Sequence, residues 1–130
     1  MYNAVAEYRK TQVLNASGVE VIVLLYDAAV QSMQLAQDGI RRKDYSSKAR
    51  FLGRALNIVN ELANVLDIER GGEIARSLRR LYDYIQHELS QANLTDDPAR
   101  LDGPIRCMRT LREAWEQLAA TPKLALAAAG

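Results

Sequence analysis

The sequence predicts an all-α protein, an antiparallel up-down four-helix bundle with an N-terminal arm. Two observations predict this fold. The alternation typical of β-strands is missing, and only three prolines and seven glycines interrupt four long helical patterns. A chain of 130 residues can bury one sizeable core but not two. We therefore expect a single domain over residues 1–121, in which residues 1–16 form the arm, and a flexible tail over residues 122–130.

Capping and turn signals place the first two helices. Ser17 and Glu20 have the spacing of a capping box, which predicts a helix beginning at Ser17 as its N-cap. This helix is expected to end near Gly39, where glycine weakens the helix and basic residues follow. Asp44 is a candidate cap for the second helix, which we expect to run to about Leu66.

Glycine and proline delimit the last two helices. The pair Gly71–Gly72 predicts a turn, because glycine reaches backbone conformations that other residues adopt only at a cost. A third helix is expected over residues 73–92. Asp97 as cap and Pro98 at the first helical position predict the start of the fourth helix, which should reach residue 118 or 119.

Each expected helix has an apolar seam, a row of residues spaced alternately four and three apart. Four such helices joined by short loops favour the up-down bundle. The seams consist of Ile22, Tyr26, Ala29, Met33, Ala36 and Ile40; of Ala49, Leu52, Leu56, Val59, Ala63 and Leu66; of Ile74, Leu78, Leu81 and Ile85; and of Leu101, Pro104, Met108, Leu111, Trp115 and Leu118.

The first two helices are more apolar than one core requires. Beside its seam, the first helix has a second apolar stripe that widens its apolar arc to roughly 200°, whereas an arc of about 100° is typical. The second stripes of these helices consist of Val21, Leu24, Leu25, Ala28 and Leu35 and of Phe51, Ala55, Ile58, Leu62 and Val65. Either the stripes pack against neighbouring helices and the arm, or part of them forms a groove for an apolar partner helix.

Charge and composition exclude several classes of protein. Lysines and arginines number 17 against 16 acidic residues, and the two signs are interleaved, so we expect no nucleic-acid partner. Asp27 and Gln31 interrupt the apolar run from Val21 to Met33, which argues against membrane insertion. The first twelve residues contain no apolar run typical of a signal peptide. We therefore expect a cytoplasmic protein.

The sequence contains no recognised catalytic, cofactor-binding or metal-binding pattern. The Glu-x-x-His pairs of di-iron bundles and the glycine-rich phosphate-binding loops are missing, so we expect no enzyme, no cofactor and no metal. His87, the only histidine, leaves one alternative, a histidine phosphotransfer domain with this residue facing solvent. The Lys and Gly that commonly surround such a histidine are missing from HELSQA.

Three blocks of sequence resemble the FliS family of flagellar export chaperones. They are NASGVEVIVLLYDAAVQSM, DIERGGEIARSLRRLYDYIQHELSQANLTDD and LREAW, and the resemblance runs from about Tyr8 to Trp115. Two departures from the family pattern are Gly18–Val19 between Ser17 and Glu20, where the family commonly has a single proline, and Ala28, where it commonly has glycine. Neither conflicts with a helix at these positions.

The resemblance implies a cytoplasmic, non-enzymatic chaperone. Such a protein binds the disordered C-terminal region of flagellin, prevents premature polymerisation and assists delivery to the flagellar type III export apparatus, whose components are further expected partners. An exposed apolar groove also allows a weak homodimer. We expect the arm to cover part of the groove until flagellin binds. The expected partner-binding residues are Tyr8, Val13, Leu14, Leu25, Tyr26, Ile58, Leu62, Tyr82 and Tyr84.

The two tyrosines of the third helix have two interpretations. Tyr82 and Tyr84 are expected on opposite shoulders of its seam, where each could pack its ring in the groove and present its hydroxyl group to a partner. Equally, both could be tyrosines at the edge of the core. The sequence leaves these alternatives open.

Overall fold

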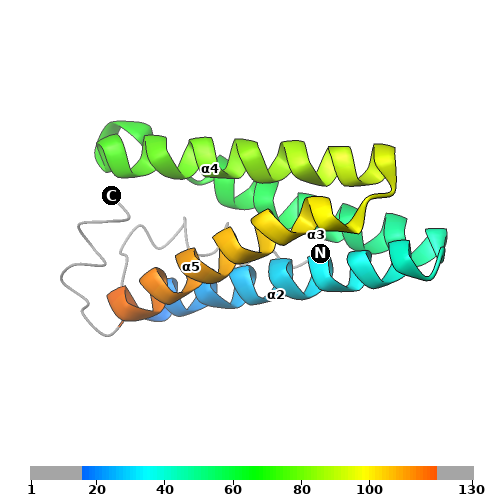
Figure 1. Ribbon diagram of the computed structural model, residues 1–130. Coiled ribbons are helices and arrows are strands. Elements are labelled where there is room, and N and C mark those ends of the chain that lie inside the picture. Colours follow the sequence, from blue (N-terminus) through cyan, green and yellow to red (C-terminus); the bar gives the residue numbers. More distant parts are fainter. Residues whose placement is uncertain (1–15, 120–130) are drawn as a thin grey trace.

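The computed structural model describes residues 16–119, and these form a bundle in which consecutive α-helices run in opposite directions (Figure 1). No β-strand occurs between residues 16 and 119. The predicted all-α up-down four-helix bundle is therefore confirmed. Its elements are α2 (Ala16–Arg41), α3 (Tyr45–Asn64), α4 (Ile68–Thr95), the short 3₁₀-helix η1 (Pro98–Leu101) and α5 (Asp102–Ala119).

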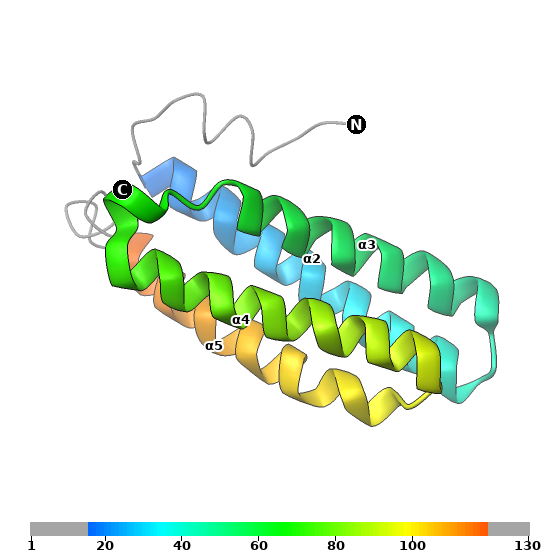
Figure 2. The same ribbon diagram turned by 90° about the horizontal axis from the view of Figure 1, so that it is seen from above.

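Helix α2 occupies the centre of the packing. It makes its most extensive contacts with α3 and α5, while α4 packs mainly against α3 and η1 (Figure 2). Every seam residue of α2, from Ile22 to Ile40, is buried. Because α2 has two close neighbours, it needs a wider apolar arc than a helix that faces only one.

Polar side chains cap the helices at two of the predicted positions. The Asp44 carboxylate accepts hydrogen bonds from the backbone N–H and the hydroxyl of Ser47, at 3.1 and 2.8 Å, and these bonds lower the pKa of Asp44. Asp97 accepts from the Ala99 N–H at 3.0 Å, but it caps the 3₁₀-helix η1, so the predicted start of the fourth α-helix at Pro98 is wrong and α5 begins at Asp102. The predicted N-cap at Ser17 is wrong, because α2 already begins at Ala16 and Ser17 lies in its first turn.

The Gly71–Gly72 pair is a kink inside α4, whereas the sequence predicted a turn before the helix. Asp67 accepts a hydrogen bond from the Arg70 N–H at 3.1 Å and thereby starts one helical turn ahead of the glycines. At Gly72 the backbone leaves the helical region, with φ 54° and ψ −129°. The glycine was thus correctly identified as a special backbone position, but α4 begins five residues earlier than expected, at Ile68 instead of Glu73.

The predicted seam of the third helix is displaced by about one residue. Ile74 is 55% exposed and Leu81 is only half-buried, whereas their neighbours Ala75 and Tyr82 are buried. A Cβ atom on Gly71 would lie only 2.6 Å from the Ala75 Cβ, so even alanine would not fit at position 71 without a shift of the neighbouring atoms. Predicted seam residue Ala49 of α3 is likewise exposed.

By length and composition alone, α2 is apolar enough to cross a membrane over Gly18–Arg41. The same features are common in the central helix of a soluble bundle. Here the buried seam packs against α3 and α5, which accounts for part of the apolar character of α2. The rest of its apolar surface faces outward beside α3.

Candidate partner-binding face

The second apolar stripes of α2 and α3 meet along one side of the bundle. On α2, Asp27 forms an ion pair with Arg112 of α5 and so marks the side facing α5. Gly39 marks the side facing α3, because a Cβ atom there would lie 2.9 Å from the Lys48 backbone nitrogen of α3. At about 100° per residue, Leu25 and Ala28 lie within about 40° of Gly39 around the helix axis. These residues therefore border α3.

We call this side the α2–α3 face, which is partly exposed. Leu24 is 66% exposed and Leu35 is 36% exposed, whereas Leu25, Phe51 and Ile58 are half-buried and pack against the core. The α2–α3 face comprises Val21, Leu24, Leu25, Ala28 and Leu35 of α2 with Phe51, Ile58 and Val65 of α3. The half-buried residues of both stripes thus contribute to core packing. The exposed residues, Leu24 and Leu35, form an apolar row in contact with solvent.

Charged residues border this apolar row. The Arg50 guanidinium lies 5.1 Å from the centre of the Phe51 ring, within range of a cation–π interaction. Arg54 and Glu61 follow on the same outer side of α3, four and three residues beyond Arg50 and Ile58. An apolar row with a charged border has the character of a docking site for an amphipathic helix.

Three of the expected partner-binding residues lie inside the bundle. Tyr26, Leu62 and Tyr82 are at most 2% exposed. A partner could contact their side chains only if the helices moved apart. The structure therefore places them beneath the surface as supports, whereas Leu25 and Ile58 lie at the α2–α3 face itself.

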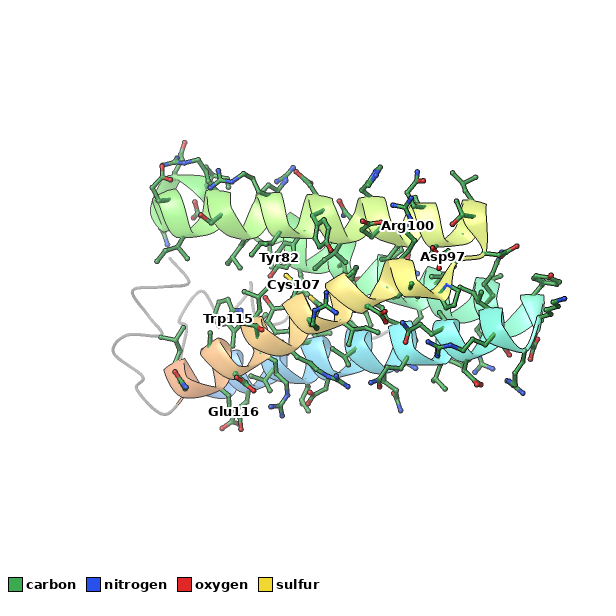
Figure 3. The ribbon with its side chains drawn as sticks, viewed as in Figure 1. Tyr82, Asp97, Arg100, Cys107, Trp115 and Glu116 are labelled. Atoms are coloured by element: carbon green, nitrogen blue, oxygen red, sulfur yellow. The ribbon has the colours of Figure 1, made fainter. Side chains whose placement is uncertain are left out.

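Tyr26 is the centre of a buried hydrogen-bonded cluster. Its hydroxyl oxygen lies 2.5 Å from that of Tyr82, and Trp115 Nε1 donates to it at 2.8 Å. Tyr82 of α4 and Trp115 of α5 are labelled in Figure 3. The cluster joins α2, α4 and α5. Burial raises the pKa of Tyr26 to about 12, although the hydrogen bonds with Tyr82 and Trp115 act in the opposite direction. The sequence placed Tyr26 and Trp115 in seams but gave no signal that their polar atoms meet.

Tyr84 lies at another contact. It is 41% exposed, and its hydroxyl group lies so close to Gly103 of α5 that a Cβ atom there would be 2.1 Å away. Tyr82 is buried at the centre of the apolar seam of α4. The expectation that Tyr82 and Tyr84 lie on opposite edges of this seam is therefore wrong for Tyr82. Tyr84 does not join the α2–α3 face.

The remaining candidates are in the arm and on α4. Tyr8, Val13 and Leu14 lie outside the described residues, so their role stays a prediction. His87 is exposed on α4, as expected. Within the described part of the chain, no three His, Cys, Asp or Glu side chains are grouped so that they could hold a metal ion.

Comparison with known proteins connects this fold to a family. The family model described as "Flagellar protein FliS" matches residues 1–122. The chain is 36% identical to the flagellar secretion chaperone FliS of Salmonella typhimurium over 110 residues, which cover 84% of this chain and 82% of that protein. It is 30% identical to the protein of the same name from Vibrio cholerae over 122 residues, covering 91% of this chain and 90% of the relative. The Campylobacter jejuni protein of that name is 34% identical over 117 residues, covering 90% and 89%.

Proposed function

Because the chain belongs to the FliS family of flagellar secretion chaperones, which are not enzymes, we propose that its client is flagellin. It binds the disordered C-terminal region of flagellin in the cytoplasm and prevents premature polymerisation. It then assists the delivery of flagellin to the flagellar type III secretion apparatus. The observation that supports this proposal is the half-exposed apolar row of the α2–α3 face.

The dimensions of the α2–α3 face suit a helical client segment. Val21 to Leu35 on α2, and Phe51 to Val65 on α3, each cover 15 residues, or about 21 Å at a rise of 1.5 Å per residue. A client helix of about four turns covers this length. Its apolar stripe would bury Leu24 and Leu35, and its polar side would remain in water.

A disordered client is compatible with release during export. A segment that folds as it binds loses conformational entropy, so a large contact area gives only moderate affinity. The arm competes with the client for the same surface. In this proposal Tyr8, Val13 and Leu14 cover part of the α2–α3 face in the free chaperone and are displaced when the client binds. These arm residues lie outside the described part of the chain.

Calorimetric titration of a flagellin C-terminal peptide tests the proposal. Leu24→Asp changes an exposed side chain and should preserve the fold, yet we expect it to weaken binding about tenfold or more, because it places a charge in an apolar contact. Ile58→Asp should have the same direction of effect. Leu94→Asp is the matched control, since Leu94 is 75% exposed but lies at the far end of α4.

The heat capacity gives a second measurement. Binding of the wild-type protein should show a clearly negative heat-capacity change, because apolar surface is buried when the peptide folds. If folded Leu24→Asp and Ile58→Asp variants bind as tightly as the wild type, the α2–α3 face is not the client site. If no variant and no wild-type protein binds the peptide, flagellin's C-terminal region is not the client.

A further inference from the structure

A small cavity lies beside the connection between α3 and α4, at the end of the bundle where α2 begins and α5 ends (Figure 2). Its volume is about 40 Å³. We call residues 65–71 the lid, because part of the cavity wall consists of Val65, Leu66, Asp67 and Gly71. The remaining described wall residues belong to the four helices and are Ile22, Leu62, Ala75, Leu78, Tyr82 and Trp115. Only a movement of the lid can therefore uncover the cavity while the helices stay packed.

Few buried side chains fix the lid to the bundle. None of residues 65–71 is buried, whereas Leu62 before the lid and Ala75 after it are buried. The apolar lid residues Val65, Leu66 and Ile68 are only half-buried. The cavity beside Val65 and Leu66 removes further contacts, because a void offers its lining no partner atoms. A segment with so little buried apolar surface opens at a lower free energy than the core does.

The hydrogen bonds of the lid connect it to itself and to the end of α3. The Arg70 N–H donates to the Asp67 carboxylate at 3.1 Å, and the Gly71 N–H donates to the Asp67 carbonyl at 2.7 Å. The two N–H groups at the start of the lid donate to carbonyls in the last turn of α3, both at 3.3 Å. Between residues 16 and 119, no hydrogen bond or ion pair joins the lid to α2 or α5. Apolar contacts alone support the lid on that side.

The lid has a non-helical residue at each end. At Gly72 the backbone has φ 54° and ψ −129°, and a Cβ atom added there would meet nothing within 4 Å. Glycine reaches this conformation and its alternatives at little steric cost, so rotation at Gly72 can move the lid without displacing the rest of α4. At the other end, Val65 has φ −93° and ψ 0° and ends the helical geometry of α3.

We propose that the lid opens as a unit about Val65 and Gly72 while the four helices stay folded, and that this opening connects the cavity beside Trp115 to solvent. Because Val65 also belongs to the α2–α3 face, opening removes one residue from that face. The lid is thus a conformational device of the free protein. Its opening does not depend on the identity of the client, and its test needs no client.

Native-state hydrogen exchange of the full-length protein, measured by NMR, tests this proposal. Corrected for intrinsic rates, the N–H groups of Arg70 and Gly71 should exchange at least about tenfold faster than those in the interior of α4, because opening the lid requires less free energy than unfolding the bundle. Low concentrations of urea should hardly change the lid rates but should raise the interior rates steeply. The sensitivity to urea scales with the surface that each opening exposes.

Three substitutions separate lid opening from global unfolding. Gly72→Ala disfavours the closed conformation, so it should accelerate exchange at Arg70 and Gly71 about tenfold. Ile85→Val removes a buried methyl group outside the cavity wall. It weakens the closed and the open state alike relative to the unfolded chain, so it should accelerate exchange in the interior of α4 and leave the lid rates unchanged. Gly53→Ala, the matched glycine control in α3, should also leave the lid rates unchanged.

Thiol labelling tests whether the opening uncovers the cavity. In a Cys107→Ser background, Leu78→Cys places a thiol in the cavity wall, and Val59→Cys places a buried thiol in α3 outside the wall. Under native conditions an aromatic disulfide reagent should label Leu78→Cys at a rate that low urea concentrations hardly change. Labelling of Val59→Cys should require global unfolding and should therefore accelerate steeply with urea. Circular dichroism establishes that both variants are folded.

Three outcomes would overturn the proposal. If the lid and the interior of α4 exchange at the same corrected rate and with the same dependence on urea, the lid opens only when the whole bundle unfolds. Unchanged lid exchange in a folded Gly72→Ala variant would show that Gly72 is not the pivot. Equal labelling rates and equal urea dependence of Leu78→Cys and Val59→Cys would show that the opening does not reach the cavity.

Discussion

The hydroxyl oxygens of Tyr26 and Tyr82 lie 2.5 Å apart inside the bundle and connect α2 to α4. Because Trp115 also donates to Tyr26, the Tyr26 oxygen serves two partners. Tyr26→Phe should therefore lower the free energy of unfolding by about 1–3 kcal/mol, the usual cost of leaving a buried polar group without its partner. Urea unfolding measures this change.

The control for that substitution is Tyr82→Phe. It leaves the Trp115–Tyr26 hydrogen bond in place, so we expect a smaller loss than for Tyr26→Phe. If both variants unfold at the wild-type urea concentration, the cluster does not contribute to stability.

Alkaline pH should weaken the bundle through Tyr26. Burial raises its pKa to about 12 in the folded protein from 10.0, so the folded state keeps its proton at a pH where the unfolded chain has lost it. The stabilisation is complete below pH 10 and is lost as the pH rises toward 12, by up to about 1.4 kcal/mol per pH unit. Urea unfolding of the wild type and Tyr26→Phe between pH 9 and about pH 11 measures the effect. The difference in stability between them should shrink with rising pH, and a constant difference would contradict the assignment.

Two glycines with different surroundings should respond to alanine in opposite directions. Gly72 has φ 54° and ψ −129°, a conformation that residues with a Cβ atom rarely adopt, so Gly72→Ala should destabilise the protein by about 1–3 kcal/mol. Gly53 lies within α3, and a Cβ atom added there would meet nothing within 4 Å, so Gly53→Ala should stabilise the protein by about 0.5–1 kcal/mol. Thermal unfolding measures both changes, and a Gly72→Ala variant that is as stable as the wild type or more stable would contradict the kink.

Within residues 16–119, the sequence predicted the number of α-helices and the buried seam of α2, because polar residues delimit the helical patterns. Asp44 and Asp97, for example, have short polar side chains directly before helical patterns, and both cap a helix in the structure. The kink at Gly72 was not predicted as such, since a glycine pair is compatible with either a loop or a kink. Only the helical turn that Asp67 starts distinguishes the two.

Side-chain size explains the errors in the third seam. Sequence periodicity favoured the aliphatic residues Ile74 and Leu81, but the packing of α4 buries the smaller Ala75 and the larger Tyr82 instead. Periodicity predicts which side of a helix is buried, with an error of about one sequence position. It contains no information on how closely a neighbouring helix approaches. Tyr82 in particular is accommodated because its hydroxyl group meets Tyr26 of another helix.

The candidate site was predictable only in part for the same reason. The wide apolar arcs of the first two helices correctly drew attention to Leu25 of α2 and Ile58 of α3. Both residues are half-buried at the α2–α3 face. They could not separate these residues from Leu62, which is buried. Exposure depends on the distance between α2 and α3, and this distance is a property of the folded bundle.

Removal of residues 1–14 tests the proposed role of the arm in covering the α2–α3 face. If the arm shields apolar surface, the truncated protein should self-associate more strongly, because Leu24, Leu35 and their neighbours would remain in contact with water. Sedimentation velocity over a range of concentrations measures this association. Introducing Leu24→Asp into the truncated protein should restore the monomer, whereas Leu94→Asp, on an exposed residue away from the face, should not. A truncated protein that stays monomeric at all concentrations would show that the arm does not shield this face. Association that Leu24→Asp fails to reverse would assign the self-associating surface to another part of the bundle.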